Sequence, residues 1–183
     1  MLNFSDYSRI SYLWAAILYQ WASSIFLIIV TTQTLYLSAI GYLIGSALFA
    51  LSDIFSLQDS TGVNKTVNYS FLLADSMLTI GSIFFFPTLD KVIIGNILFE
   101  TGGWINLINH TIKFIILYKN PTPTWKIEVF SRIFNCFGTV MFILGNIFLI
   151  HDAPKYFETG FILFTTGSVG FTLGGIFSFT SCK

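Results

Sequence analysis

Residues 157–179 read FETGFILFTTGSVGFTLGGIFSF, an apolar run in which Glu158 is the one charged residue. A helix needs about 20 apolar residues to cross about 30 Å of hydrocarbon, so this run is long enough to span a membrane. Five further stretches qualify in the same way, and none shows the period-2 alternation that membrane strands need. The sequence therefore predicts an all-α integral membrane protein with six transmembrane helices, at residues 11–30, 34–56, 69–88, 92–117, 129–150 and 157–179.

The composition of the whole chain agrees with a lipid environment. Of 183 residues, 54% are hydrophobic and 10% are charged, and the mean hydropathy is +0.75, which is far more apolar than soluble domains are. Nine basic residues balance nine acidic ones, which leaves no basic surplus to neutralise a phosphate backbone. We therefore expect membrane lipids as partners and no nucleic acid.

The connections between the predicted helices alternate in length. They are tight at Thr31–Gln33, Thr88–Lys91 and His151–Lys155, and longer and polar at Leu57–Asn68 and Lys119–Lys126. This alternation predicts three tandem helical hairpins, at residues 11–56, 69–117 and 129–179, within a single membrane domain that covers residues 1–183.

Lys and Arg are distributed unevenly between the two sides of this arrangement. The tight turns carry two of them, Lys91 and Lys155, whereas the ends and longer loops carry Arg9, Lys65, Lys113, Lys119, Lys126, Arg132 and Lys183. By the positive-inside rule, both termini are predicted to lie in the cytoplasm or on its topological equivalent. Which membrane holds the protein is left open.

An internal repeat relates the three hairpins. The first helix of each carries a small-small-Ile-Phe element, and the second carries a small pair 21 or 22 residues later. The elements begin at Ser23, Gly81 and Gly145, and the pairs begin at Gly45, Gly102 and Gly167. The match is closest between GNILFETG at residues 95–102 and GFILFTTG at residues 160–167. The pattern indicates that a two-helix unit has been triplicated.

These elements resemble the YrhK-like domain, a small two-helix membrane unit with an aromatic-Leu-x-x-Gly-Ser signature on each helix. The third hairpin carries FILGN at 142–146 and LFTTGSVGF at 163–171, and the second carries LTIGSIF at 78–84 and LFETGG at 98–103. The first hairpin keeps the signature in its second helix, as YLIGSALF at 42–49, but has Ser23 and Ser24 in place of Gly-Ser in its first. The family has no assigned activity, so the resemblance implies a membrane unit and no catalytic residues.

The small residues predict close contacts between helices, because lipid provides no hydrophobic force that draws helices together. Gly41 and Gly45 form a GxxxG motif, as do Gly170 and Gly174, and other glycines recur at intervals of seven. The glycines expected in helix contacts are Gly41, Gly45, Gly81, Gly102, Gly145, Gly167, Gly170 and Gly174.

Three ionisable residues fall at membrane depth: Asp75, Glu100 and Arg132. Each costs about 2.5–3.5 kcal/mol on insertion scales, which makes it a candidate for a functional role. Asp75 and Arg132 fall near the cytoplasmic ends of their helices, so we expect them to pair, whereas Glu100 falls nearer the opposite side. Such a pair would either hold the second and third hairpins in register or belong to a proton or ion relay.

The fourth predicted helix carries a polar face. Asn106, Asn109, His110 and Lys113 follow at i, i+3, i+4 and i+7, so they share one side of the helix. This face would line a solvated vestibule, bind a lipid headgroup or meet a partner subunit. No Cys, second His or acid stands at ligand spacing from His110, so we predict neither a metal site nor another cofactor.

Two classes of function remain after enzymes are set aside. No nucleophile has a base at plausible spacing and the loops are too short to build a pocket, so we predict no catalytic residues. A structural or accessory subunit is the first expectation, with other membrane subunits or a second copy as partner, because the small-residue stripes exceed what one bundle needs. A small channel or transporter is the alternative, suggested by Asp75, Glu100 and the polar face. Water at Asp75, Glu100 and Asn106 would favour transport.

Overall fold

The computed structural model describes residues 3–28, 30–150 and 154–181, and these residues form long α-helices and a short 3-10 helix without any strand. The helices are α1 (Phe4–Ile28), α2 (Thr32–Gln58), α3 (Gly62–Ile83), α4 (Val92–Lys119), α5 (Trp125–Ile150) and α6 (Pro154–Thr180), with η1 (Pro87–Leu89) between α3 and α4. The all-α prediction is confirmed.

Three helices in the described ranges are long and apolar enough to cross a membrane: α2, α5 over Trp125–Leu149 and α6 over Glu158–Thr180. The chain is therefore a membrane-embedded protein, but hydropathy alone identifies three spans where the sequence reading expected six. In α3 and α4, polar side chains such as Asp75 and Asn106 lower the hydropathy of the helix.

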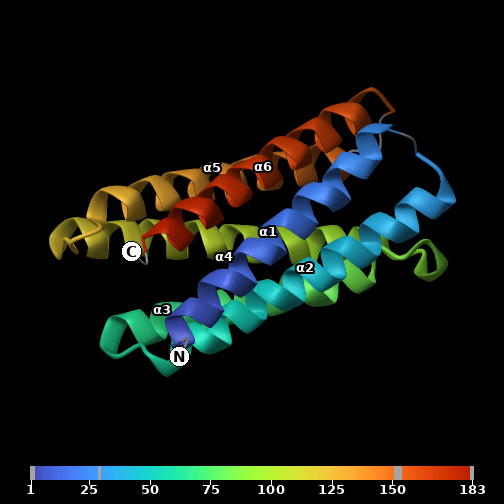
Figure 1. Ribbon diagram of the computed structural model, residues 1–183. Coiled ribbons are helices and arrows are strands. Elements are labelled where there is room, and N and C mark those ends of the chain that lie inside the picture. Colours follow the sequence, from blue (N-terminus) through green and yellow to red (C-terminus); the bar gives the residue numbers. More distant parts are fainter. Residues whose placement is uncertain (1–2, 29, 151–153, 182–183) are drawn as a thin grey trace.

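The helices pack as a closed ring in chain order. Each hairpin pairs two helices, α1 with α2, α3 with α4 and α5 with α6, and the hairpins meet where α2 contacts α3, α4 contacts α5 and α6 contacts α1. Figure 1 shows them running side by side, with both termini and the α2–α3 and α4–α5 connections at one end. We call this the termini end. The start of α2 and η1 lie at the other, the tight-turn end.

Local sequence explains where the tight turns fall. Thr31 caps α2 through a capping box in which its side chain and that of Thr34 each accept from the other's backbone N–H. Helix α3 ends at Ile83, five residues earlier than predicted, ahead of Pro87, which begins η1. Asp90 then adopts a left-handed conformation with φ 47°, which Asp tolerates better than most residues.

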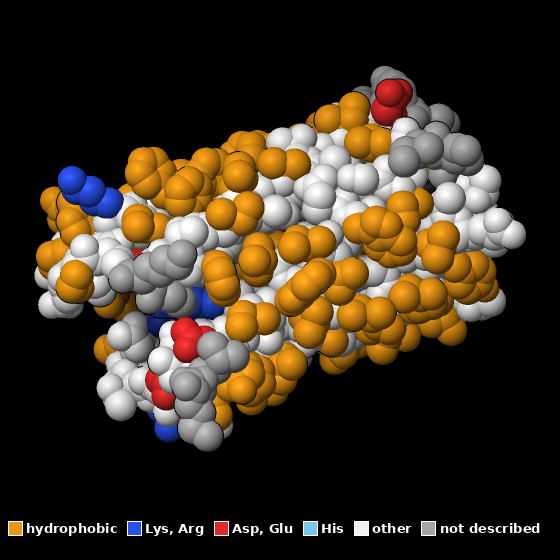
Figure 2. Space-filling view, in the orientation of Figure 1, with side chains coloured by type: hydrophobic (Ala, Val, Ile, Leu, Met, Phe, Trp, Pro, Cys, Tyr) orange, Lys and Arg blue, Asp and Glu red, His pale blue; other side chains and the backbone are white. Residues whose placement is uncertain are grey.

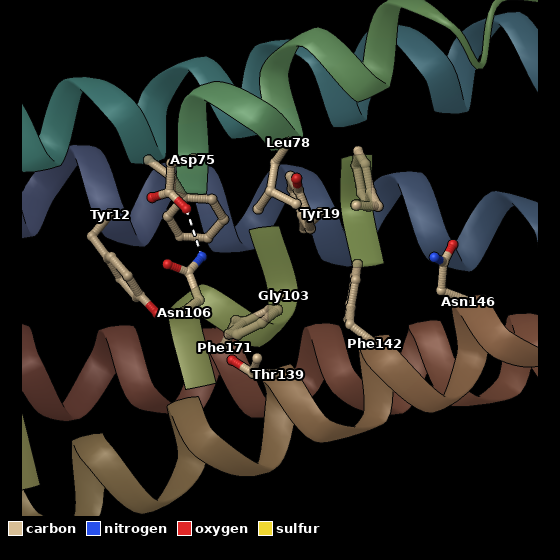
Figure 3. A pocket seen from close by; sticks show the side chains of 12 residues that line it. Tyr12, Tyr19, Asp75, Leu78, Gly103, Asn106, Thr139, Phe142, Asn146 and Phe171 are labelled. Atoms are coloured by element: carbon tan, nitrogen blue, oxygen red, sulfur yellow. Dashed lines mark hydrogen bonds between the residues drawn. The ribbon is translucent and has the colours of Figure 1, made fainter. Parts of the chain in front are cut away.

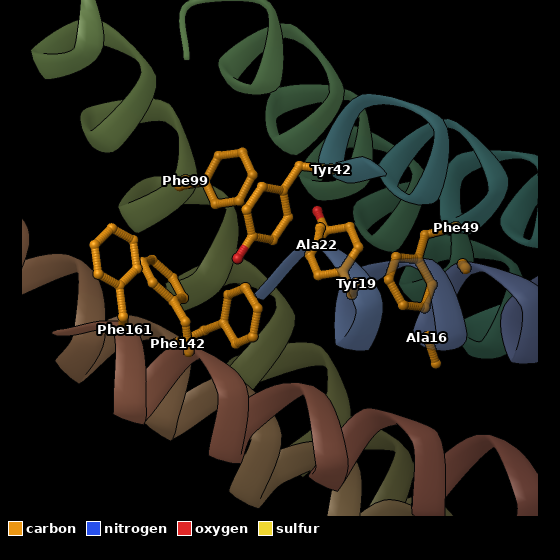
Figure 4. Packing of buried hydrophobic residues seen from close by; sticks show 10 residues of the cluster. Ala16, Tyr19, Ala22, Tyr42, Phe49, Phe99, Phe142 and Phe161 are labelled. Carbon is orange, nitrogen blue, oxygen red and sulfur yellow. The ribbon is translucent and has the colours of Figure 1, made fainter. Parts of the chain in front are cut away.

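Aromatic rings fill the centre of the helix ring. Six of them are buried in one cluster and come from α1, α2, α4, α5 and α6: Tyr19, Tyr42, Phe49, Phe99, Phe142 and Phe164. Figure 4 labels all of these except Phe164. Tyr19 and Tyr42 pack edge to face with centroids 5.1 Å apart, and Phe142 and Phe164 do so at 4.6 Å. These are favourable aromatic geometries. We call these six residues the aromatic core.

Glycines allow the helices of each hairpin to approach closely. A methyl group on Gly102 would lie 2.9 Å from the backbone oxygen of Ala74, and one on Gly145 would lie 2.9 Å from that of Gly160. The same holds for all the glycines predicted in contacts: an added Cβ would come within 3.0 Å of an atom of a neighbouring helix at Gly41, Gly45, Gly81, Gly102, Gly145, Gly167, Gly170 and Gly174. These glycines therefore make close helix contacts within this chain.

Buried polar contacts join the hairpins to one another. The hydroxyl oxygens of Ser46 in α2 and Ser82 in α3 are 3.4 Å apart, and those of Ser168 in α6 and Ser23 in α1 are 2.8 Å apart. At the remaining boundary, Asn146 Nδ2 in α5 donates to a backbone oxygen of α4 at 2.6 Å. Each boundary therefore has a polar contact that involves a residue of the repeated elements, namely Ser23, Ser82 or Asn146.

Candidate functional site

A polar cavity of about 670 Å³ opens at the termini end of the ring. We call it the vestibule. It reaches inward along the helices to Asp75, and its lining includes Ser8, Arg9, Tyr12, Asp53, Asp59, Asn68, His110, Lys113, Glu128, Arg132, Asn135 and Ser178. Figure 2 shows the contrast from outside: hydrophobic side chains cover the flank, and blue and red charged side chains gather around a hollow at the termini end.

Asp75 and Tyr12 line both the vestibule and a second cavity of about 40 Å³, which lies deeper in the ring. Asn106 and Thr139 add polar groups to this smaller space, shown in Figure 3. Its volume suits one or two water molecules beside polar partners. Beyond it, the aromatic core fills the interior towards the tight-turn end.

Asp75 is held at the floor of the vestibule by two neighbouring helices. Asn106 Nδ2 in α4 donates to Asp75 Oδ1 at 2.7 Å, the dashed contact in Figure 3. The carboxyl group of Asp53 in α2 lies within hydrogen-bonding reach of Asp75. Two acids and an amide therefore meet at membrane depth.

Asp53 is the residue that sequence reasoning missed. It falls in the last turns of an apolar stretch, where a carboxylate is easily interpreted as marking the helix end. The sequence did contain one indication of its role. Ser52 and Ser56 lie close to Asp53, and together the three residues would give this end of α2 a polar side. Only the packing of α2 against α3 shows that this side faces Asp75.

The expected ion pair between Asp75 and Arg132 is wrong. Asp75 takes Asn106 and Asp53 as its partners instead. The reason is the order of helices in the ring: α4 lies between α3 and α5, so the two residues line different walls of the same vestibule.

The polar face of α4 turns into the ring. Asn106 lines the smaller cavity, and His110 and Lys113 line the vestibule. The His110 ring packs edge to face on Phe71 at 4.8 Å, and Lys113 Nζ donates to Asn64 Oδ1 at 3.1 Å. Asn109 is buried without lining either cavity, and its Nδ2 meets no acceptor among the described residues. Three of the four residues of this face therefore line a cavity.

Glu100 lies apart from this site. It accepts hydrogen bonds from Trp104 Nε1 at 2.8 Å and from Asn146 Nδ2 at 3.2 Å, and it lines neither cavity. Its carboxylate therefore helps to join α4 to α5.

The described residues form no cluster of metal ligands. Across residues 3–28, 30–150 and 154–181, no three His, Cys, Asp or Glu side chains lie together as a set of ligands. The site offers acids, amides, hydroxyls and cations around a water-sized space, which suits the binding of a proton or of a small polar solute.

The similarity to the YrhK-like domain rests on short motifs and stays a prediction. Comparison with protein-family models, with curated proteins and with solved structures finds no match to this chain.

Proposed function

We propose that this protein is a small membrane transporter or channel in which all of the helices α1 to α6 cross the bilayer. Even α3, with 22 residues, is about 33 Å long at 1.5 Å per residue, which is enough to cross about 30 Å of hydrocarbon. Helices α1, α3 and α4 pack alongside the three apolar spans, so they would lie at the same depth. Arg9, Asp75 and Lys113 on these helices line the vestibule, which lowers the usual cost of placing them at membrane depth.

The observation that carries the proposal is the reach of the vestibule to Asp75. A polar cavity that extends from one end of a membrane bundle to a buried carboxyl group is typical of solute and ion pathways. The aromatic core closes the opposite half, so the arrangement matches a transporter open to one side. The positive-inside rule would make that side the cytoplasmic one.

The repeat belongs to the same proposal. The close contacts of Gly81 with the backbone of Gly95 and of Gly145 with that of Gly160 occur at equivalent positions of the second and third hairpins. Three two-helix units arranged around one axis would leave a central space. The polar residues of that space differ between hairpins, so the pathway would be asymmetric.

An accessory subunit remains the second candidate, favoured by the aromatic core, which leaves no open passage to the tight-turn end. The glycines, however, no longer argue for outside partners, because their contacts are satisfied within the chain. Lipids, other membrane subunits and a second copy of the chain remain the predicted partners.

Cysteine accessibility tests the vestibule. In a background with both native cysteines changed to Ser, Asn68→Cys places a thiol in the vestibule lining, and Ala22→Cys places one in the closed half. In proteoliposomes of known orientation, we expect a membrane-impermeant thiol reagent to modify the first at least tenfold faster than the second, and from the termini side alone. Equal, slow labelling of both would contradict a water-filled vestibule.

Solute flux tests transport itself. Proteoliposomes are screened with protons, monovalent ions and small polar solutes, and Asp75→Asn is compared with Glu100→Gln, which alters an acid outside the cavities. We expect Asp75→Asn to lose the flux and Glu100→Gln to keep it. Absence of flux together with stoichiometric partner chains in native mass spectrometry would favour the accessory subunit.

A further inference from the structure

We propose that Asp53 and Asp75 together form a single-proton binding site at the floor of the vestibule, so that a proton is the ion this protein takes up from the termini end. The inference rests on the proposed function and adds to it the identity of the ion and the two groups that hold it.

The placement of two carboxyl groups in one cavity on adjacent helices favours a shared proton. They come from neighbouring helices, line the same cavity and lie within hydrogen-bonding reach of each other. Two carboxylates at such a distance repel strongly when both are charged, whereas a carboxyl group that donates to a carboxylate forms a charge-assisted hydrogen bond. The stable form of the pair carries one proton and one negative charge.

The surroundings decide which member carries the proton. Asp75 Oδ1 accepts from Asn106 Nδ2 at 2.7 Å, and a donor of this kind stabilises a carboxylate. Asp53 Oδ2 is buried and meets no donor among the described residues, which is costly for a charged oxygen and tolerable for a neutral acid. We therefore assign the proton to Asp53, with its O–H donating to Asp75. Loading adds one proton from vestibule water to a doubly charged pair, and release returns it.

Nearby charges allow the proton to leave. Lys113 and Arg132 line other walls of the same vestibule, and positive charge near a carboxyl group favours the loss of its proton. They oppose the effect of burial, so the site can exchange its proton. The other ionisable groups that line the vestibule are Arg9 and Tyr12 from α1, Asp59 at the end of α2, His110 from α4 and Glu128 from α5, while the described lining from α6 is Ser178.

Infrared spectroscopy of the purified protein in lipid detects the proton directly. A protonated carboxyl group gives a C=O stretching band that moves in D₂O, and we expect one such band at neutral pH that disappears in alkaline buffer. Asp53→Asn and Asp75→Asn should each lose it: the first removes the proton carrier, and the second removes the carboxylate that keeps Asp53 neutral beside Lys113 and Arg132. Asp59→Asn is the matched control, because it alters an exposed acid of the same cavity and should keep the band.

Two results would overturn the proton site. One is a lack of any protonated-carboxyl band in the unmodified protein at neutral pH, a measurement that depends on no variant. The other is a band that persists unchanged in both folded Asn variants, with folding judged by circular dichroism and gel filtration. A vestibule closed to thiol reagents would refute the proposed function and leave the band unaffected, so the two failures are distinguishable.

Discussion

At the scale of single residues, the molecule depends on how a few polar atoms are satisfied inside an apolar ring. Asn106 is placed one helix away from Asp75 and donates to its carboxylate, while Asn109, three residues further along the same helix, has an amide nitrogen without an acceptor among the described residues. The amide nitrogen therefore makes a hydrogen bond at Asn106 and none among the described residues at Asn109.

This difference predicts unequal effects of two matched substitutions. Asn106→Leu removes a hydrogen bond to a charged group, which is worth roughly 1.5–3 kcal/mol, and leaves Asp75 short of a donor. Asn109→Leu removes a nitrogen that has no partner in the described chain, so we expect a change of less than about 1 kcal/mol. Reversible unfolding in mixed micelles measures both free energies. Equal losses would mean that the Asp75 contact adds no stability.

At the scale of helices, the glycines set the distance between the two members of each hairpin. Gly102 and Gly103 are neighbours in α4 but face different surroundings. A Cβ added to Gly102 would lie 2.9 Å from the backbone oxygen of Ala74, which is held rigidly in α3. A Cβ added to Gly103 would lie 3.0 Å from the side chain of Ile143, which can move. Helix α3 can yield only by moving as a whole, whereas Ile143 can rotate.

We therefore predict that Gly102→Ala destabilises the protein by about 1–3 kcal/mol through overpacking. Both alanines gain about 1 kcal/mol of helix propensity, so Gly103→Ala should come out close to neutral and serves as the control. Thermal unfolding in one detergent compares the two. A Gly102→Ala protein as stable as the unmodified one would contradict the close approach of α3 and α4.

At the scale of the whole molecule, the ring separates a polar end from a closed apolar end. With all of α1 to α6 crossing the bilayer, both termini lie on one side, the side to which the vestibule opens. Reporter fusions at residue 1 and residue 183 should therefore give the same, cytoplasmic, signal, and a fusion in the η1 turn should give the opposite one. Opposite signals from the two termini would mean an odd number of crossings.

The helices themselves follow from sequence, since the length and apolarity of the stretches depend on local composition. The predicted ranges agree with the structure to within a few residues at most ends, and η1 occupies the tight turn expected after Pro87. The largest differences are seven residues at the starts of α1 and α3 and five at the end of α3. At α3 they come from turn residues, since Thr61 precedes the helix and Pro87 follows it. Polar side chains on α3 and α4 lower the hydropathy of these helices, and hydropathy identifies three candidate spans among the described residues.

The sequence by itself determined that this is an all-α membrane protein of helical hairpins with small residues at helix contacts, because periodicity, run length and residue size are local properties. Tertiary structure alone decided which polar groups meet. The ring order placed α4 between Asp75 and Arg132 and brought Asp53 to Asp75. Such pairings depend on how helices far apart in the chain are rotated and how deep they lie in the bundle. Many weak contacts, spread over the whole bundle, determine that rotation and that depth.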